Sequence, residues 1–157
     1  MDYIMKKRYY AAYGSNLNIG QMQIRCLGAR VIGTSLIPNY ELLFKGSRTG
    51  AYLTIEEKEG AEVPVGIWEV DERNEAALDR YEGFPQFYYK REISIPVKEI
   101  GSGRVRDRMI FVYIMHEDRE LGIPTEGYLH ICRQGYEDFK FDGRMLQKAV
   151  RRSGRGI

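Results

Sequence analysis

Between residues 29 and 115 the chain is a succession of apolar, strand-like runs joined by short polar turns. The runs are rich in β-branched and aromatic residues, which favour a pleated, half-buried surface. They cover residues 29–36, 40–44, 51–55, 63–70, 87–98 and 105–115, and a further run lies at 9–13. Connections this short join strands in antiparallel pairs. The sequence therefore predicts a mostly antiparallel sheet that curls or closes around a core.

Helical periodicity appears in four other segments, at residues 18–27, 71–81, 125–139 and 144–152. Asn18, Asp71 and Asp142 are suitable caps for three of the starts, and Gly28 and Gly83 for two of the ends. The apolar members of the first helical pattern are Leu17, Met22, Ile24, Cys26 and Leu27, and those of the third are Tyr128, Ile131, Cys132, Gly135 and Phe139. About six or seven strands with three or four helices indicate an α+β fold class. A length of 157 residues suits a single domain spanning 1–157.

Composition excludes several classes of protein. The net charge is +2, from 24 basic and 22 acidic side chains, which gives no general case for a nucleic-acid partner. No stretch approaches the roughly 20 apolar residues of a membrane span, and the start lacks the apolar core of a secretory signal. Cys26 and Cys132 each lie in an apolar helical pattern, which favours buried free thiols over a disulfide. The predicted location is therefore cytoplasmic.

Basic residues are concentrated after Asp142, at Arg144, Lys148, Arg151, Arg152 and Arg155. They could form a basic arm for an acidic partner, or a solvated helix end followed by a frayed tail at 153–157. We prefer the second interpretation because cations suit a helix C-terminus. Truncation after Arg152 is accordingly expected to be silent.

A strand, a polar turn and a helix start follow one another in the stretch YYAAYGSNL, residues 9–17. Gly14, Ser15 and Asn16 supply the turn, since glycine permits unusual backbone angles and the polar side chains bond turn amides. Several backbone N–H groups then converge in one concavity, which can attract a carboxylate or a developing oxyanion. An ordinary strand-to-helix turn would have the same sequence.

Glu82 is expected at the end of the predicted 71–81 helix, among the aromatic residues Tyr81, Phe84, Phe87, Tyr88 and Tyr89. Apolar rings and the negative end of a helix dipole should both raise the pKa of its carboxyl. A raised pKa suits a general base that works near neutral pH. The alternative is a solvated helix-terminal glutamate with no special role.

Three motifs, in this order, resemble the gamma-glutamylcyclotransferase-like family, which includes gamma-glutamylamine cyclotransferases and plant AIG2-like proteins. They are YGSNL near the N-terminus, DRYEGFPQFYYKR at 79–91 and PTEGYLHICRQG at 124–135. Together they span roughly residues 9–139. The resemblance implies a small mixed, mostly antiparallel β-barrel with helices packed outside it.

The resemblance also implies the chemistry. In this family the α-amine of a gamma-glutamyl compound attacks its own δ-carbonyl and releases 5-oxoproline with an amine or amino acid. The implied activity is an acyltransferase or lyase type that requires no metal, cofactor or protein nucleophile. Glu82 matches the catalytic base. The implied substrate-binding residues are Tyr13, Gly14, Ser15, Asn16, Leu17, Asn18, Tyr88 and Tyr128, although adjacent Tyr89 leaves the register at Tyr88 open.

Other chemistries lack support in the sequence. His116, His130 and the two cysteines show no metal-ligand spacing, and neither the G-x-S-x-G nor the phosphate-loop pattern is present. The expected partner is a small gamma-glutamyl substrate, with no nucleic acid and no membrane. A non-catalytic module that binds gamma-glutamyl or amino-acid-like ligands remains an alternative, as does, less favoured, a small RNA-binding barrel using the basic tail. The leaving amine and the choice between monomer and homodimer stay open.

Overall fold

The computed structural model describes residues 5–154 and contains a closed barrel of five strands. The strands are β1 (Arg8–Ala12), β2 (Arg30–Lys45), β3 (Tyr52–Val70), β4 (Tyr88–Glu99) and β5 (Val105–Met115). Around the barrel they follow the order β1-β3-β2-β4-β5. Every neighbouring pair is antiparallel except β1 and β5, whose short parallel pairing at Tyr9 and Ile110 closes the barrel. The predicted α+β class and mostly antiparallel barrel are confirmed.

The barrel has fewer strands than the sequence predicts because two of its strands are unusually long. β2 continues through residues 37–39, where the register with β3 shifts between Pro38 and Tyr40 and Asn39 adopts a φ of 61°. The charged segment 56–62 is not a turn but the middle of β3, where Glu56, Glu57 and Glu62 pair with β2 on either side of the register shift. The side chain of Asn39 accepts a hydrogen bond from the amide of Gly60, 3.0 Å away, across this bulge. A bulge lets a strand bend without ending, so four predicted strands become two.

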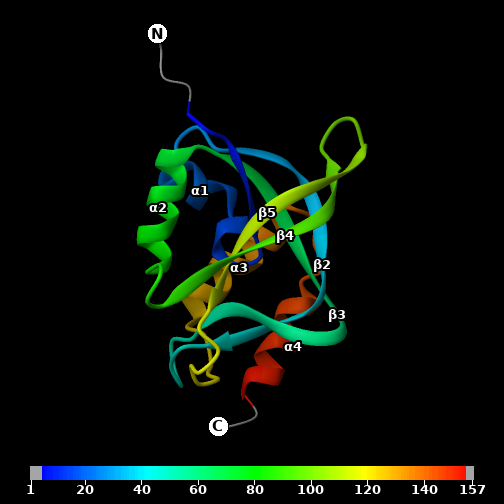
Figure 1. Cartoon of the computed structure of the whole chain (residues 1–157). Coiled ribbons are helices and arrows are strands. Elements are labelled where there is room, and N and C mark those ends of the chain that lie inside the picture. The colour runs from blue at the N-terminus through cyan, green and yellow to red at the C-terminus, as the bar shows by residue number, and fades with distance from the viewer. Residues whose placement is uncertain (1–4, 155–157) are drawn as a thin grey trace.

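Helices surround the barrel, as Figure 1 shows. A short 3₁₀ helix, η1 (Ser15–Leu17), leads into α1 (Ile19–Arg25), and the others are α2 (Glu72–Glu82), α3 (Glu126–Asp138) and α4 (Arg144–Ser153). α1 contacts α2, α3 packs against η1, and α4 packs against β2. Within residues 5–154, no helix combines the length and the hydrophobicity needed to span a bilayer.

Local sequence accounts for most helix ends. Asn18 caps α1, Asp71 caps α2 in a capping box with Asn74, and the hydroxyl of Thr125 caps α3. Gly83 ends α2 in the left-handed conformation, as expected of a glycine at this position. Asp142 is not the N-cap of α4, which is Gly143, but its carboxylate accepts a hydrogen bond from the amide of Arg144.

The core fills the barrel and extends under the helices. Its largest fully buried side chains include Phe44, Phe111, Tyr113 and Tyr136. Both cysteines are buried and free, as predicted. The predicted apolar face of α1 is wrong for Ile24 and Leu27, which are 83% and 81% exposed. α1 has only seven residues and turns only Met22 fully into the core.

The end of α4 is anchored, so the predicted frayed tail does not begin at Ser153. The hydroxyl of buried Ser153 accepts a hydrogen bond from the amide of Phe44, 2.7 Å away, and donates one to the carbonyl of Ala149. Arg152 donates to the carbonyl of Leu42 at 2.6 Å. Arg152 therefore ties α4 to β2 and is not a solvated cation, whereas residues 155–157 of the predicted tail lie outside the described part of the chain.

This anchor gives a first prediction. Ser153→Ala should lower the free energy of unfolding by about 1–3 kcal/mol, because the buried amide of Phe44 loses its acceptor. Truncation after Arg152 should have the same cost and is no longer expected to be silent for stability. Urea unfolding measures both. Arg151→Ala, at an exposed position on the same turn, is the control and should stay within about 0.5 kcal/mol of the wild type.

Candidate active site

A cavity of about 380 Å³ opens beside the end of α2. It is lined mainly by aromatic side chains from four strands and two helices, together with the loop that precedes η1. The lining residues are Tyr10, Tyr13, Gly14, Ser15, Asn16, Tyr52, Leu53, Arg80, Tyr81, Glu82, Gly83, Phe87, Tyr88, Tyr113 and Tyr128. Of the predicted site residues, the structure thus brings together Glu82, Tyr13, Gly14, Ser15, Asn16, Tyr88 and Tyr128.

Glu82 is the last residue of α2 and is partly exposed to the cavity. Burial raises the pKa of its carboxyl to about 8, and the nearby positive charge of Arg25 partly opposes that rise. The direction agrees with the sequence-based prediction, and its largest cause is loss of water around the charged form. Among the described residues, no side chain or backbone group forms a hydrogen bond or ion pair with this carboxyl. Glu82 is therefore available to exchange a proton with a bound molecule.

Tyrosines from several elements surround Glu82. Its charge contributes to raising the pKa values of Tyr10, Tyr13, Tyr88, Tyr113 and Tyr128, after the larger effect of burial. All these phenols therefore stay neutral at physiological pH. The hydroxyl of Tyr13 donates to the carbonyl of Tyr113 at 2.7 Å, and that of Tyr88 donates to the carbonyl of Leu53 at 2.8 Å. Such bonds hold the rings in place as a rigid wall.

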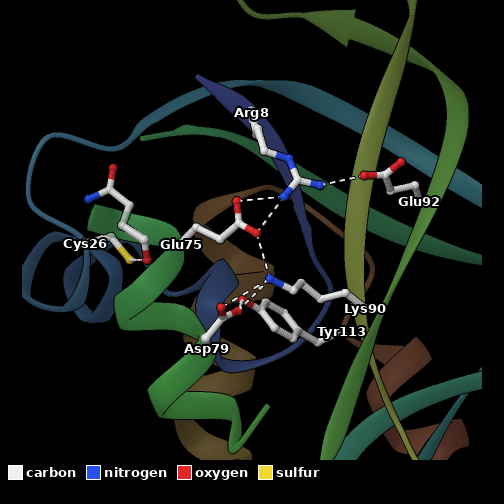
Figure 2. A network of polar contacts seen from close by, with 8 residues as sticks. Arg8, Cys26, Glu75, Asp79, Lys90, Glu92 and Tyr113 are labelled. Atoms are coloured by element: carbon white, nitrogen blue, oxygen red, sulfur yellow. Dashed lines mark hydrogen bonds and ion pairs between the residues drawn. The ribbon is translucent and has the colours of Figure 1, made fainter. Parts of the chain in front are cut away.

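A network of ion pairs fixes α2 against the barrel one turn before Glu82, as Figure 2 shows. Lys90 of β4 lies between two carboxylates of α2, with its ammonium 2.7 Å from Glu75 and 2.9 Å from Asp79. Glu75 also pairs with Arg8 of β1 at 2.6 Å. The hydroxyl of Tyr113 donates to Asp79 at 2.6 Å, which connects this network to the cavity wall. The helix end that carries Glu82 is thereby tied to three strands.

Gly14 and the first two residues of η1 present backbone N–H groups at the cavity. Gly14, Ser15 and Asn16 line it, and the amides of Ser15 and Asn16 have no hydrogen-bond acceptor among the described residues. Leu17 and Asn18 do not line the cavity, contrary to prediction. Leu17 is fully buried in the core, and Asn18 caps α1 and donates to the carbonyl of Ile131 at 3.2 Å. Once the chain turns into η1, these two residues face the protein interior.

Tyr88 and Tyr89, the two candidate tyrosines that follow Gly83, lie on opposite faces of β4. Tyr88 is buried and lines the cavity, whereas the hydroxyl of Tyr89 points away and donates to the carboxylate of Glu117 at 2.6 Å. Successive residues of a strand point to opposite faces, so only one of them can reach the cavity. The structure therefore places Tyr88, and not Tyr89, at the site.

α3 brings Tyr128 to the cavity because it approaches η1 very closely. Gly135 makes this approach possible, since a Cβ atom there would lie 2.7 Å from the backbone nitrogen of Asn18. The hydroxyl of Tyr128 accepts a hydrogen bond from the amide of Leu53 at 3.1 Å. Tyr128 thus supports the barrel wall as well as facing the cavity.

Tyr128→Phe should therefore affect both stability and turnover. Loss of the hydroxyl leaves the buried amide of Leu53 without an acceptor, at a cost of about 1–3 kcal/mol. We expect turnover to fall roughly 3- to 10-fold, as a weakened hydrogen bond of about 1 kcal/mol implies. Urea unfolding and initial rates measure the two effects. Tyr89→Phe is the matched control, and an equal loss of turnover in that variant would contradict this placement of the site.

Several residues of the cavity wall were not predicted from the sequence. Tyr52 and Tyr113 line the cavity from strands that are far apart in sequence, and no local motif marks them. Tyr10 and Phe87 also line it and lie within the stretches 9–17 and 79–91, but they were not named as site residues. Arg25 was also missed because it follows the YGSNL loop by one helix. Its guanidinium lies 3.5 Å from the ring centroid of Tyr81 and donates to the side-chain oxygen of Asn16. A cationic side chain from α1 therefore contacts Asn16 of this segment.

The arrangement suits proton transfer beside an anion-binding loop. It combines a carboxyl poised to titrate near neutral pH, free backbone amides and an apolar aromatic wall. Within the described residues, no three His, Cys, Asp or Glu side chains are grouped as a metal site would require.

Comparison with known proteins places these features in a family. A family model described as "Gamma-glutamyl cyclotransferase, AIG2-like" matches residues 10–130, which include every lining residue of the cavity. A comparison with curated protein sequences finds no match.

Solved structures share the fold. A protein described as gamma-glutamyl cyclotransferase superposes with a TM-score of 0.76 at 22% identity, over 92% of this chain and 86% of its own. An uncharacterized protein from Homo sapiens gives a TM-score of 0.76 at 24% identity, over 91% and 86%. A yeast protein described as a gamma-glutamyl cyclotransferase specific to glutathione gives 0.59 at 10% identity, over 96% and 98%. At these identities the likeness establishes a common fold.

Proposed function

Because the chain belongs to the gamma-glutamyl cyclotransferase, AIG2-like family, we propose that it cyclises gamma-glutamyl compounds and releases 5-oxoproline with an amine or amino acid. The observation that carries this proposal is the carboxyl of Glu82. It lies at the cavity without a bonding partner among the described residues and has a pKa of about 8. A side chain with those properties is costly to bury and is typical of a general base.

The proposed reaction begins with proton transfer. The substrate enters with its α-amine as an ammonium, and the carboxylate of Glu82 accepts one of its protons. The freed amine nitrogen then attacks the δ-carbonyl carbon of the same molecule. Because nucleophile and electrophile belong to one substrate, most of the entropic cost of bringing them together is absent. The cavity needs to hold the glutamyl chain in a bent conformation, which its fixed tyrosine rings suit.

The second half of the reaction breaks the original amide bond. The attack places a negative charge on the carbonyl oxygen, and the amides of Ser15 and Asn16 are suitably free to stabilise this oxyanion or the substrate carboxylate. Glu82, now protonated, delivers its proton to the leaving nitrogen, and the carbon–nitrogen bond breaks. The regenerated carboxylate then accepts the second proton of the attacking nitrogen and passes it to the released amine, which departs as an ammonium. The other product, 5-oxoproline, leaves as well, and Glu82 is again a carboxylate.

A panel of gamma-glutamyl compounds tests the proposal, with 5-oxoproline as the measured product. Two control substrates define the chemistry. An N-acetyl-gamma-glutamyl amide lacks the nucleophilic amine, and an α-glutamyl amide lacks the scissile δ-amide, so neither should yield 5-oxoproline. Binding of gamma-glutamyl compounds without any product would instead identify a non-catalytic binding module on the same fold.

The charges at the cavity predict which leaving amines are preferred. Among the described residues, Arg80 is the one Lys or Arg that lines the cavity, and Glu82 is its one acid. A polycationic leaving group therefore has no carboxylate to pair with except that of the proposed base, Glu82. It is also repelled by the positive charge of Arg80. We expect kcat/KM to be about tenfold higher for a gamma-glutamyl α-amino acid than for a gamma-glutamyl polyamine, a difference of about 1.4 kcal/mol. A reversed preference would contradict this interpretation of the cavity charge.

A further inference from the structure

Arg25 lies outside the cavity and contacts two segments that line it, η1 through Asn16 and the end of α2 through Tyr81. It is the last residue of α1, and no motif that identifies the site includes it. One guanidinium nitrogen donates to the side-chain oxygen of Asn16, and another donates to Gln21 at 3.2 Å. The flat face of the guanidinium lies 3.5 Å from the ring centroid of Tyr81, the neighbour of Glu82.

Together with a second contact, these interactions join η1 to the end of α2 in two ways. The hydroxyls of Ser15 and Tyr81 are hydrogen-bonded at 3.1 Å, so Tyr81 contacts the loop directly as well as through Arg25. Asn16 is held on its other side, where its amide group donates to the hydroxyl of Tyr10 at 2.9 Å. The loop amides and the end of α2 are thereby kept at a fixed separation. An arginine suits this role because its planar group can stack and donate hydrogen bonds at once.

We propose that Arg25 is a positioning residue of the proposed cyclisation, bridging the Asn16 loop to Tyr81 and holding a positive charge beside Glu82. This inference rests on the proposed function for its catalytic meaning, but the bridge and the charge are properties of the protein itself. Arg25 does not line the cavity, so it acts through Asn16, Tyr81 and Glu82.

Among the charged groups of the described residues near Glu82, Arg25 is the one that influences the pKa of its carboxyl. Phenols from several elements share the cavity with it: Tyr10 on β1, Tyr13 just after β1, Tyr88 on β4, Tyr113 on β5 and Tyr128 on α3, with Tyr81 on its own helix. On the network side, Lys90 pairs with both Glu75 and Asp79. Arg80, on the same helix as Glu82, also lines the cavity, but its charge is not among the influences on the pKa of Glu82. Two influences act on the pKa of Glu82, namely burial, which raises it, and Arg25, which lowers it. Without Arg25 the carboxyl should hold its proton to higher pH.

The first experiment measures Glu82 directly and needs no substrate. The protein is labelled with ¹³C at glutamate side-chain carboxyls, and the Glu82 signal is assigned by its loss in Glu82→Gln. Arg25→Met and Arg25→Gln should each move the titration midpoint of that signal upward by about one pH unit, as removal of a nearby opposite charge requires. Arg25→Gln retains a donor for Asn16, so it serves even where Arg25→Met fails to fold. Arg25→Lys keeps the charge and should leave the midpoint near that of the wild type.

The second experiment measures 5-oxoproline formation as a function of pH. Near pH 7, Arg25→Gln should lose about tenfold in kcat/KM and recover toward the wild type above pH 9, because a higher pKa leaves less of the base ionised. Arg25→Lys should lose activity equally at all pH values, since it cannot both stack and bridge. Arg30→Met is the matched control, because Arg30 is exposed and pairs with Glu69 at 3.1 Å on the outer surface.

The two readouts separate this inference from the proposed function. Unchanged Glu82 midpoints in both Arg25→Met and Arg25→Gln would overturn the inference, whether or not the protein makes 5-oxoproline. A wild-type protein that makes no 5-oxoproline, but whose Glu82 midpoint moves upward in these variants, would refute the proposed function and leave the electrostatic role of Arg25 standing. A loss of melting temperature with activity reduced equally at every pH in Arg25→Gln would show that the role is structural only.

Discussion

Glu82→Gln should lower the turnover of gamma-glutamyl substrates about 100-fold or more, the usual contribution of a positioned acid–base group. Glutamine preserves the shape of the side chain but can neither accept the ammonium proton nor deliver it to the leaving nitrogen. Because the carboxyl has no hydrogen-bond or ion-pair partner among the described residues, the substitution breaks no such bond there and removes only the charge interaction with Arg25. Initial rates of 5-oxoproline release measure the effect. Near-normal release would rule out the assigned role.

The same variant should be more stable than the wild type at neutral and alkaline pH. Glu82 has a folded-state pKa of about 8, raised from an ordinary value of 4.5. Its contribution to stability is therefore fully present below pH 4.5 and is lost as the pH rises toward 8. The advantage of Glu82→Gln should be absent near pH 4.5 and reach roughly 1–3 kcal/mol at pH 8, allowing for partial exposure.

Urea unfolding at the two pH values tests this expectation. Glu59→Gln is the matched control, because Glu59 is an exposed glutamate of β3, and it should change neither stability nor turnover. An equal stability of Glu82→Gln and the wild type at pH 8 would show that Glu82 is ionised in the folded protein at no cost, as an ordinary surface glutamate is.

The second large effect concerns pH. With a base whose pKa is about 8, kcat/KM should fall about tenfold for each pH unit below 8, because only the carboxylate accepts a proton. Between pH 9 and pH 6 the expected loss is about 100-fold. Rates measured across this range at constant ionic strength give the profile, and Glu82→Gln should show a nearly flat residual rate. An acid limb that breaks near pH 4 to 5 would assign the proton transfer to an unperturbed carboxyl.

Local sequence patterns predicted most of the fold, and they failed where a long-range pairing overrode them. Asp71 and Gly83 mark the ends of α2 through chemistry that a helix end always requires, so their roles were readable. The segments 37–39 and 56–62 look like turns, yet β2 and β3 both continue past them and pair again on the far side of the bulge. A bulge and a mutually supported ladder do not depend on the intrinsic preferences of the residues they contain.

In the candidate site, too, features set by neighbouring residues in the sequence were predictable, and features set by the fold were not. The raised pKa of Glu82 followed from the aromatic residues that flank it in the sequence, and the structure bears out its direction. Leu17 and Asn18, which the resemblance implied as substrate-binding residues, do not line the cavity, because a motif gives the order of residues and not the direction of their side chains. Arg25 and the pairing of Arg8 with Glu75 arise from elements that meet only in the fold, so no spacing in the chain could indicate them.

The close contact of α3 with η1 also determines when, during synthesis of the chain, the cavity can form. η1 leaves the ribosome more than a hundred residues before α3, which places Gly135 against its backbone. At about 5–20 residues per second, that interval lasts roughly 5 to 20 seconds for each nascent chain. β5 ends at Met115, so toward the end of this interval all five strands have been synthesised while Leu17 and the YGSNL segment still lack the helix that covers them. The cavity is therefore completed only after all the barrel strands, when α3 contributes Tyr128 to its wall.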